Sequence, residues 1–276
     1  MVSRGNLVFG ISAFDSSILV ESADSEIRDA LDRYIFPPLP RNESAPFSAD
    51  VHLFVDREGD RFRVEVDRKF AGSADTLHDA SLAAVKALDE VIVHRMRMYR
   101  AIHAGAVLIE GRALLLPGSS HAGKSSLVAE LLRRGASHFS DEYALIDSEG
   151  RVHSYLRPLL LRKGGPLQTL VLPEELNAGF AVHPAHVGWI LALDYSPGAV
   201  WEVQKVSQGE AVVLLLRNTP HEMVTTPEMI DFFLRVADKA VCFAGRRGDA
   251  AEAATHIFDL ICQKSDAPPE YGQRAF

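Results

Sequence analysis

Apolar and polar residues alternate along two short stretches in the first quarter of the chain. Residues 51–56 read VHLFVD and residues 61–67 read RFRVEVD, so every second position of each stretch is apolar. Successive side chains of a strand point to opposite faces, so both stretches have one face suited to burial. The intervening REGD supplies turn residues, and the two stretches are predicted to form a β-hairpin.

A long helix is predicted directly after this hairpin. Residues 77–99 contain neither proline nor glycine and place Leu82, Val85, Leu88 and Val91 at near-helical intervals. We expect this helix to link the two parts of the chain, to pack in the core and to take no part in chemistry.

Apolar runs and amphipathic segments alternate after residue 100, as in an α/β domain. The segments are RALLLPG (112–118), SSLVAELLRRGA (125–136), HVGWILALD (186–194), TTPEMIDFFLRVADKA (225–240) and AVCFAGRRGD (240–249). Thr226 before Pro227 predicts a helix start, and Asp249 with Glu252 resembles a capping box. The predicted organisation is a small α+β N-terminal domain with its connecting helix over residues 1–100, an α/β domain over residues 101–264 and a flexible tail over residues 265–276.

Composition and charge narrow the functional classes. The chain has 276 residues, of which 47% are hydrophobic. Its formal net charge of -8 argues against electrostatic binding of nucleic acid. Its apolar runs are shorter than a membrane-spanning helix requires, and we expect no secretion signal. Cys242 and Cys262, the two cysteines, lack a CxxC spacing, and we expect buried thiols in a cytoplasmic protein.

The segment LLLPGSSHAGKSS, residues 114–126, contains the pattern G-x-x-x-x-G-K-[ST] between a predicted strand and a predicted helix. Glycines allow several backbone N–H groups to point to one centre, and the helix N-terminus adds a positive potential there, so phosphates are the expected ligand. Lys124 would reach the β- and γ-phosphates and Ser125 would bind Mg²⁺. The alternative is a glycine-rich turn with an exposed lysine. The predicted nucleotide-binding residues are Gly118, Ser119, Ser120, His121, Ala122, Gly123, Lys124, Ser125 and Ser126.

The phosphate loop alone does not choose between a kinase, a GTPase, a transporter ATPase and a switch. An N/T-K-x-D segment and an LSGGQ-like segment are both missing from the sequence, which disfavours the common switches and transporters. Two places can supply the acidic groups that phosphoryl transfer requires. They are Asp141 with Glu142, whose side chains would point to opposite sides of an extended segment, and Asp194, at the end of an apolar run.

The run IHAGAVLIEGRALLLPGSSHAGKSSLVAELLRRGASHFSDEYALID, residues 102–147, resembles the catalytic domain of the HPr kinase/phosphorylase family. His103 matches a histidine that opens a strand in that family, the phosphate loop follows, and Asp141 with Glu142 matches an acidic pair. The pair is usually two aspartates, so the glutamate is a departure. The resemblance implies an HPr kinase-like P-loop fold for the second domain.

The resemblance also implies roles for these residues. Asp141 would act as the base toward a substrate hydroxyl, and Glu142 and Ser125 would hold Mg²⁺. His103 would lie beside the phosphates and stabilise or orient the reacting group, and Lys124 would help to neutralise the γ-phosphate. A downstream segment, SYLRPLLLRKGG, resembles one that supplies a cation near the phosphates in this family. The candidates there are Arg157, ranked first, Arg162 and Lys163.

The architecture is most similar to HPr-kinase-like proteins of modified-peptide biosynthesis, including the lasso peptide kinases, which phosphorylate a C-terminal serine. The resemblance thus implies an ATP- and Mg²⁺-dependent kinase whose partner is a peptide or protein serine hydroxyl, without nucleic-acid or membrane partners and with a possible homo-oligomer. Two alternatives stay open, a small-molecule hydroxyl kinase and a nucleotide-dependent regulatory or binding module.

Overall fold

The computed structural model of the chain describes residues 7–35, 41–42, 49–118, 122–155, 157–162, 167–220 and 225–265. The predicted loop residues Ser119, Ser120 and His121 lie outside these ranges. So do Lys163 and residues 266–276 of the predicted tail.

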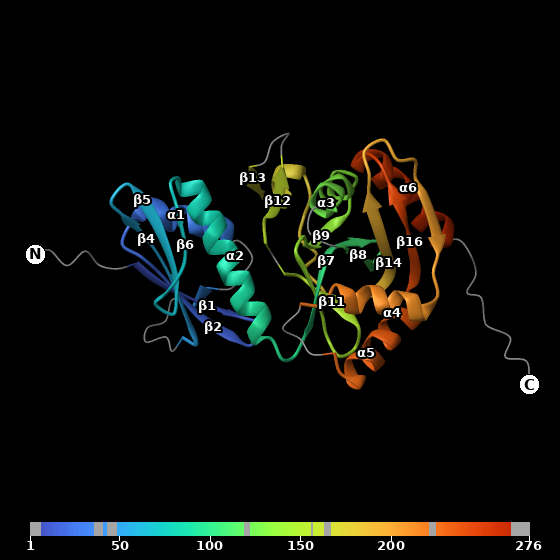
Figure 1. The fold of residues 1–276 in the computed structure, drawn as a ribbon, viewed down its shortest axis with the longest axis horizontal. Helices are drawn as coiled ribbons and strands as arrows, with labels where there is room; N and C mark the ends of the chain where they lie inside the picture. The colour runs from blue at the N-terminus through green and yellow to red at the C-terminus, as the bar shows by residue number, and fades with distance from the viewer. Residues whose placement is uncertain are drawn as a thin grey trace, which may run out of the picture.

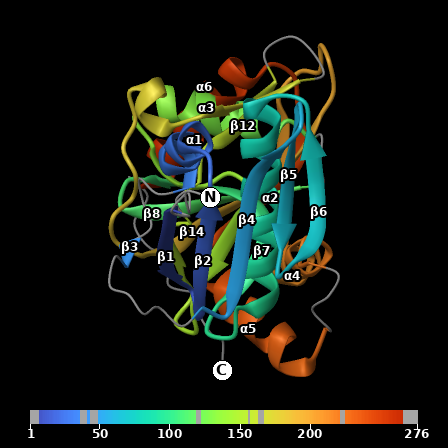
Figure 2. The same cartoon turned by 90° about the vertical axis from the view of Figure 1, so that its left-hand side faces the viewer.

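Six strands form a first sheet in the order β3-β1-β2-β4-β5-β6, in which only the β2–β4 pair is parallel. Figure 2 shows these strands side by side. The predicted hairpin is confirmed, because β4 and β5 pair antiparallel and turn their alternate apolar residues into the core. The strands are β1 (Leu7–Ala13), β2 (Ser16–Ser22), β3 (Arg41–Asn42), β4 (Val51–Glu58), β5 (Arg61–Val66) and β6 (Lys69–Ala74).

Two helices, α1 (Ser25–Ile35) and α2 (Leu77–Arg95), share one hydrophobic core with this sheet. Helix α2 begins at the capping residue Thr76 and ends four residues earlier than the sequence predicts. It lies between the first sheet and the rest of the chain (Figure 1). We refer to residues 7–95 as the N-terminal unit and to residues 100–265 as the C-terminal unit.

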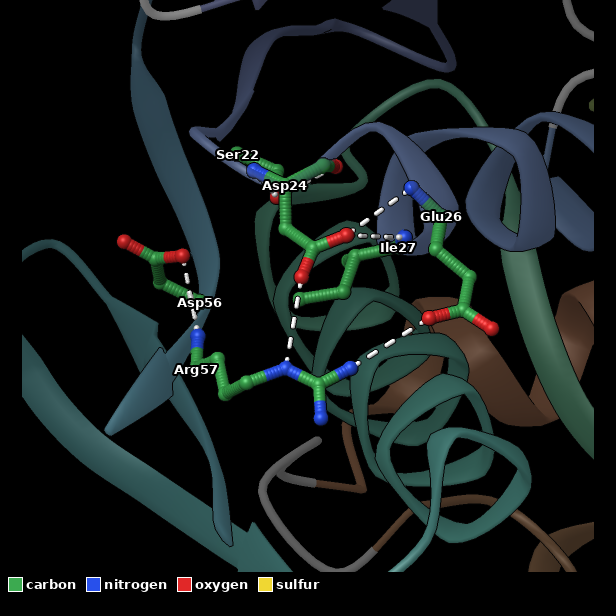
Figure 3. A network of polar contacts seen from close by, with 6 residues as sticks. All are labelled: Ser22, Asp24, Glu26, Ile27, Asp56 and Arg57. Atoms are coloured by element: carbon green, nitrogen blue, oxygen red, sulfur yellow. Dashed lines mark hydrogen bonds and ion pairs between the residues drawn. The ribbon is translucent and has the colours of Figure 1, made fainter. Parts of the chain in front are cut away.

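Ion pairs connect the N-terminal end of α1 to strand β4. The Asp24 carboxylate accepts hydrogen bonds from the backbone N–H groups of Glu26 and Ile27, at 2.8 and 3.3 Å, and so caps the helix. Arg57 of β4 donates to both Asp24 and Glu26, each at 3.3 Å (Figure 3). These contacts fix the helix over its sheet.

Eight strands form the second sheet, with the path β11-β10-β7-β8-β14-β16-β15 and β9 paired to β7. Strands β8, β14 and β16 are parallel neighbours, and a separate hairpin joins β12 to β13. The strands are β7 (Arg100–Ile109), β8 (Arg112–Pro117), β9 (Ser137–Ser140), β10 (Tyr143–Ile146), β11 (Arg151–His153), β12 (Leu159–Arg162), β13 (Gln168–Val171), β14 (Ala185–Tyr195), β15 (Glu202–Lys205) and β16 (Val241–Arg247).

Helices cover both faces of the second sheet. One core contains α3 (Lys124–Arg133) and α6 (Ala250–Ser265), and a second core contains α4 (Gln208–Arg217) and α5 (Pro227–Asp238). The two pairs lie on opposite sides of the strands in Figure 1. A short 3₁₀ helix, η1 (Pro173–Leu176), follows β13. The chain is therefore a mixed α/β protein with several sheets.

The two units share apolar packing. The core of the N-terminal unit includes Ala101, Leu145 and Tyr155, which belong to the C-terminal unit. The ring of Phe14, in the β1–β2 turn, meets the ring of Tyr155 edge-on at a centroid distance of 5.5 Å. Helix α2 is consequently packed from both sides.

Two expectations from composition have direct counterparts in the structure. Across the described residues, every helix is too short or too polar to span a bilayer. Cys242 is buried as expected, whereas Cys262 of α6 is exposed, which corrects the expectation that both thiols are buried. Both are free thiols.

Candidate functional site

The candidate residues lie close together at strand β7, because two consecutive strands, β9 and β10, pair with different parts of it. Strand β9 pairs with residues 106–108 of β7, and β10 pairs with residues 100–103. The turn between β9 and β10 holds Asp141 and Glu142, so the acidic pair passes directly beside His103. On the other edge of β7, Ala104 pairs with Pro117 at the end of β8. Residues from three strand ends therefore meet at one place.

The predicted phosphate loop connects β8 to α3. Helix α3 begins at Lys124, and Gly123 before it is left-handed, with φ +70°. A Cβ atom at Gly123 would also lie 2.6 Å from the Arg247 guanidinium. Glycine is thus required here both by backbone conformation and by space. The Lys124 ammonium donates to the Gly118 carbonyl at 2.8 Å, across the mouth of the loop.

Arg247, at the end of β16, hydrogen-bonds to the C-terminal end of this loop. Its guanidinium donates to the carbonyls of Ala122 and Gly123 at 3.2 and 2.7 Å, and to Gly248 at 3.0 Å. The Tyr195 ring lies 5.1 Å from the guanidinium carbon. The side chain is 2% exposed, and burial lowers its pKa from the ordinary arginine value. Arg247 thereby holds the backbone carbonyls of Ala122 and Gly123, directly before α3.

His103, Glu142 and Lys124 form a connected polar cluster. His103 Nε2 lies 2.9 Å from Glu142 Oε1 and 3.5 Å from the Lys124 ammonium. The backbone keeps the partners in register, because Ala104 N–H donates to the Glu142 carbonyl at 3.2 Å. An acid–imidazole pair is a common arrangement for proton transfer, and here it stands next to the loop lysine.

The electrostatics of the cluster support a charged carboxylate. Burial pushes the pKa of Glu142 upward, but the hydrogen bond from His103 and the charges of His103, Lys124 and Lys86 outweigh it, so its pKa lies below the ordinary value. Burial lowers the pKa of Lys124, while the two carboxylates nearby act in the opposite direction. The cavity thus contains opposite charges that an anion and a hydroxyl can engage.

Asp141 has a different environment from its neighbour. It is 2% exposed, and its Oδ2 accepts a hydrogen bond from Leu160 N–H at 3.0 Å. Oδ1 is buried without a hydrogen-bond partner among the described residues. Burial raises the pKa of Asp141 to about 6, although the Leu160 amide and the Ser125 hydroxyl lower it. A buried, incompletely satisfied carboxylate beside the loop serine is typical of a functional group rather than a stabilising one.

A cavity of about 290 Å³, here called the Lys124 cavity, collects most of the predicted residues. Three lining residues, Lys86 of α2, Leu160 of β12 and Gln168 of β13, are not among the residues predicted from the sequence. Glu142 lines it and Asp141 does not, and the two residues lie in a turn rather than on the extended segment that the sequence predicts. The lining residues are Lys86, His103, Gly123, Lys124, Ser125, Ser126, Glu142, Leu160, Arg162 and Gln168.

The other described candidates lie elsewhere. Gly118 and Ala122 of the predicted loop line a second cavity, and Arg157 and Asp194 do not line the Lys124 cavity either. Arg157, ranked first as the phosphate cation, is 3% exposed and donates through Nε to Asp89 of α2 at 2.7 Å. Arg157 does not line the Lys124 cavity, because the buried Asp89 of the N-terminal unit binds it. Arg162, another cation of the same segment, does line the cavity. Asp194, the alternative acid, lines a separate cavity of about 720 Å³ at the carboxyl ends of β14 and β16.

The sequence contains only weak indications of the two charged site residues that it does not predict, Arg247 and Lys86. Arg247 is the last residue of β16, and a charged residue at this position marks the carboxyl edge of a parallel sheet, the usual ligand-binding edge. Lys86 interrupts the apolar pattern of α2 as an ordinary exposed lysine does, and no local feature distinguishes it.

Comparison with known proteins gives a limited result. No protein-family profile matches the chain, and no curated protein matches it. Among solved structures, the chain is similar to one titled "Structure of the Hpr(Ser) kinase/phosphatase from Coxiella burnetii", with a TM-score of 0.33 and 13% sequence identity over 60% of this chain and 99% of that chain. A similarity of this degree does not assign a family, so the function rests on the geometry of the Lys124 cavity.

Proposed function

We propose that the chain is a P-loop kinase that transfers the γ-phosphate of ATP to a hydroxyl group, namely a serine of a peptide or protein. One observation carries the proposal. In a single cavity, the loop lysine Lys124 meets an acid–imidazole pair, Glu142 and His103, with the helix N-terminus and Ser125 beside them. A phosphate grip next to a charged carboxylate is what hydroxyl phosphorylation requires.

Ser125, which lines this cavity, and its neighbour Asp141, which does not, are residues that fit a magnesium ion. Asp141 Oδ1 is a buried carboxylate oxygen with no hydrogen bond among the described residues, and the Ser125 hydroxyl interacts with the same carboxylate group. Mg²⁺ is commonly held by one or two carboxylates together with substrate phosphates. When bound, the ion supplies positive charge that neutralises the phosphate oxygens.

The geometry favours a division of labour opposite to the one that the resemblance implies. Glu142 faces the cavity, is held charged by its surroundings and accepts a hydrogen bond from His103, so we assign it to orient the acceptor hydroxyl and take its proton. Asp141 is buried and lies next to Ser125, which lines the cavity, so we assign it to the metal. Lys124 and the loop amides bind the transferred phosphate.

The resemblance extends the proposal to the acceptor. Similarity to HPr-kinase-like proteins of modified-peptide biosynthesis suggests a peptide acceptor with a C-terminal serine. ATP as the nucleotide and a cytoplasmic setting belong to the same proposal.

The test is to incubate the protein with ATP, Mg²⁺ and a panel of serine-containing peptides and small hydroxyl metabolites, and to measure phosphate addition by mass spectrometry. We expect transfer to serine peptides, and its loss in Lys124→Ala but not in Lys239→Ala, which changes an exposed lysine after α5. Transfer to metabolites alone would show a small-molecule kinase. Wild-type rates in Lys124→Ala would refute the assignment of the loop.

A further inference from the structure

Helix α2 contacts the C-terminal unit through one polar face. His78 and Lys86, two turns apart on this face, both contact Gln168 of β13. His78 Nε2 lies 2.9 Å from the Gln168 carbonyl, and the Lys86 ammonium donates to the Gln168 side-chain oxygen at 2.9 Å. The N-terminal unit therefore rests directly on the hairpin that borders the Lys124 cavity.

A buried anchor lies one turn further along the same helix. Asp89, three residues after Lys86, accepts hydrogen bonds from the Tyr155 hydroxyl at 2.6 Å and from Arg157 Nε at 2.7 Å. Asp89 is 7% exposed, Arg157 3% and Tyr155 fully buried. Separating such a pair would leave an uncompensated charge, which is costly. The anchor thus fixes the position of Lys86 relative to the cavity.

The Lys124 cavity is rich in positive charge. Lys86, Lys124 and Arg162 line it, and Glu142 is the one acidic side chain among its described lining residues. The Lys86 charge acts on Glu142 across the cavity. Lys86 is itself exposed. Its ammonium has therefore not lost its hydration on folding and is accessible to a ligand. This charge balance suits a polyanion that extends beyond the phosphate loop.

We propose that Lys86 is a γ-phosphate-binding residue that the N-terminal unit supplies to the site. The inference rests on the proposed nucleotide site and adds a residue from outside the P-loop region. Lys124, at the start of α3, holds the phosphate chain, and Lys86, which lines the same cavity from α2, binds the equatorial oxygens on which charge collects during transfer. Since ADP has no γ-phosphate, Lys86 distinguishes ATP from ADP.

The experiment measures binding without an acceptor. Isothermal titration calorimetry compares a non-hydrolysable ATP analogue with ADP, both with Mg²⁺, for the wild type, Lys86→Gln, Lys86→Arg and Lys69→Gln. We expect Lys86→Gln to weaken the ATP analogue by about tenfold, the scale of one charge-assisted contact, and to leave ADP unchanged. Lys86→Arg keeps the charge and most of the discrimination, and Lys69→Gln, an exposed lysine of β6, changes neither affinity.

A second variant tests the anchor. Asp89→Asn weakens the hold of Arg157 on α2, and we expect it to reduce the ATP analogue affinity while ADP affinity is kept. Equal weakening of both nucleotides by Lys86→Gln, or no weakening of either, overturns the inference. If the wild type binds neither nucleotide, the proposed function itself fails, so the two failures are distinguishable.

Discussion

The buried carboxylate of Asp141 gives a stability prediction that needs no substrate. Burial raises its pKa from the ordinary 3.8 to about 6. One pKa unit corresponds to about 1.4 kcal/mol, so the ionised form of Asp141 costs the folded state about 3 kcal/mol relative to the protonated form. We therefore predict that Asp141→Asn, which is neutral and nearly isosteric, stabilises the protein at alkaline pH.

The sign follows from proton linkage. Below the unfolded-state pKa the carboxyl is protonated in both states, and wild type and variant differ only by the changed hydrogen bonds of the amide. As the pH rises through the folded-state pKa, the buried carboxyl of the wild type ionises and the free energy of unfolding falls. The amide variant has no group that ionises, so its free energy of unfolding does not fall in this way. The stability difference in favour of Asp141→Asn should therefore grow by about 3 kcal/mol between about pH 4 and about pH 8.

Urea unfolding with a chelator present, followed by tryptophan fluorescence at several pH values, measures this difference. Glu142→Gln is the matched control, because the pKa of Glu142 is lowered and its charge favours the folded state. Its stability relative to wild type should fall as the pH rises, the opposite slope. A pH-independent difference for Asp141→Asn would refute the reasoning. Adding Mg²⁺ with nucleotide should stabilise the wild type more than the variant, because the ion favours the carboxylate.

Two further predictions concern the loop and the imidazole. Arg247→Met removes the hydrogen bonds that hold the loop carbonyls, so we expect nucleotide affinity to fall by at least about tenfold, whereas Arg246→Met, an exposed neighbour, leaves it unchanged; calorimetry measures both. His103→Ala removes the hydrogen bond that lowers the pKa of Glu142, so the acid limb of the transfer rate should shift to higher pH; an unmoved limb would contradict the assignment of Glu142 as the base.

Local patterns predicted the parts of the site that depend on short stretches. The strand before the phosphate loop, the helix after it and the hairpin of β4 and β5 follow from periodicity and glycine positions close together in the chain. The resemblance over residues 102–147 assigns His103, Asp141 and Glu142 to one site, and in the structure His103 Nε2 lies 2.9 Å from Glu142 Oε1.

Long-range partners were not predictable from the same patterns. Arg247 and Gly123 are 124 residues apart, Lys86 and Gln168 are 82 apart, and Arg157 and Asp89 are 68 apart. Each contact depends on how whole elements dock, which no local pattern encodes. The resemblance indicates Arg157 as a phosphate cation, and the sequence does not reveal that a helix far upstream brings the carboxylate of Asp89 to it.

The shared core of the two units has a consequence for folding. Tyr155 is buried among residues of the N-terminal unit, and its hydroxyl bonds to Asp89, so neither unit completes its interior alone. Cooperative unfolding requires that loss of one region destabilise the other, and this interface meets that requirement. The protein should therefore melt in one transition, and a cut in the segment between α2 and β7 should lower the melting temperature of both units together.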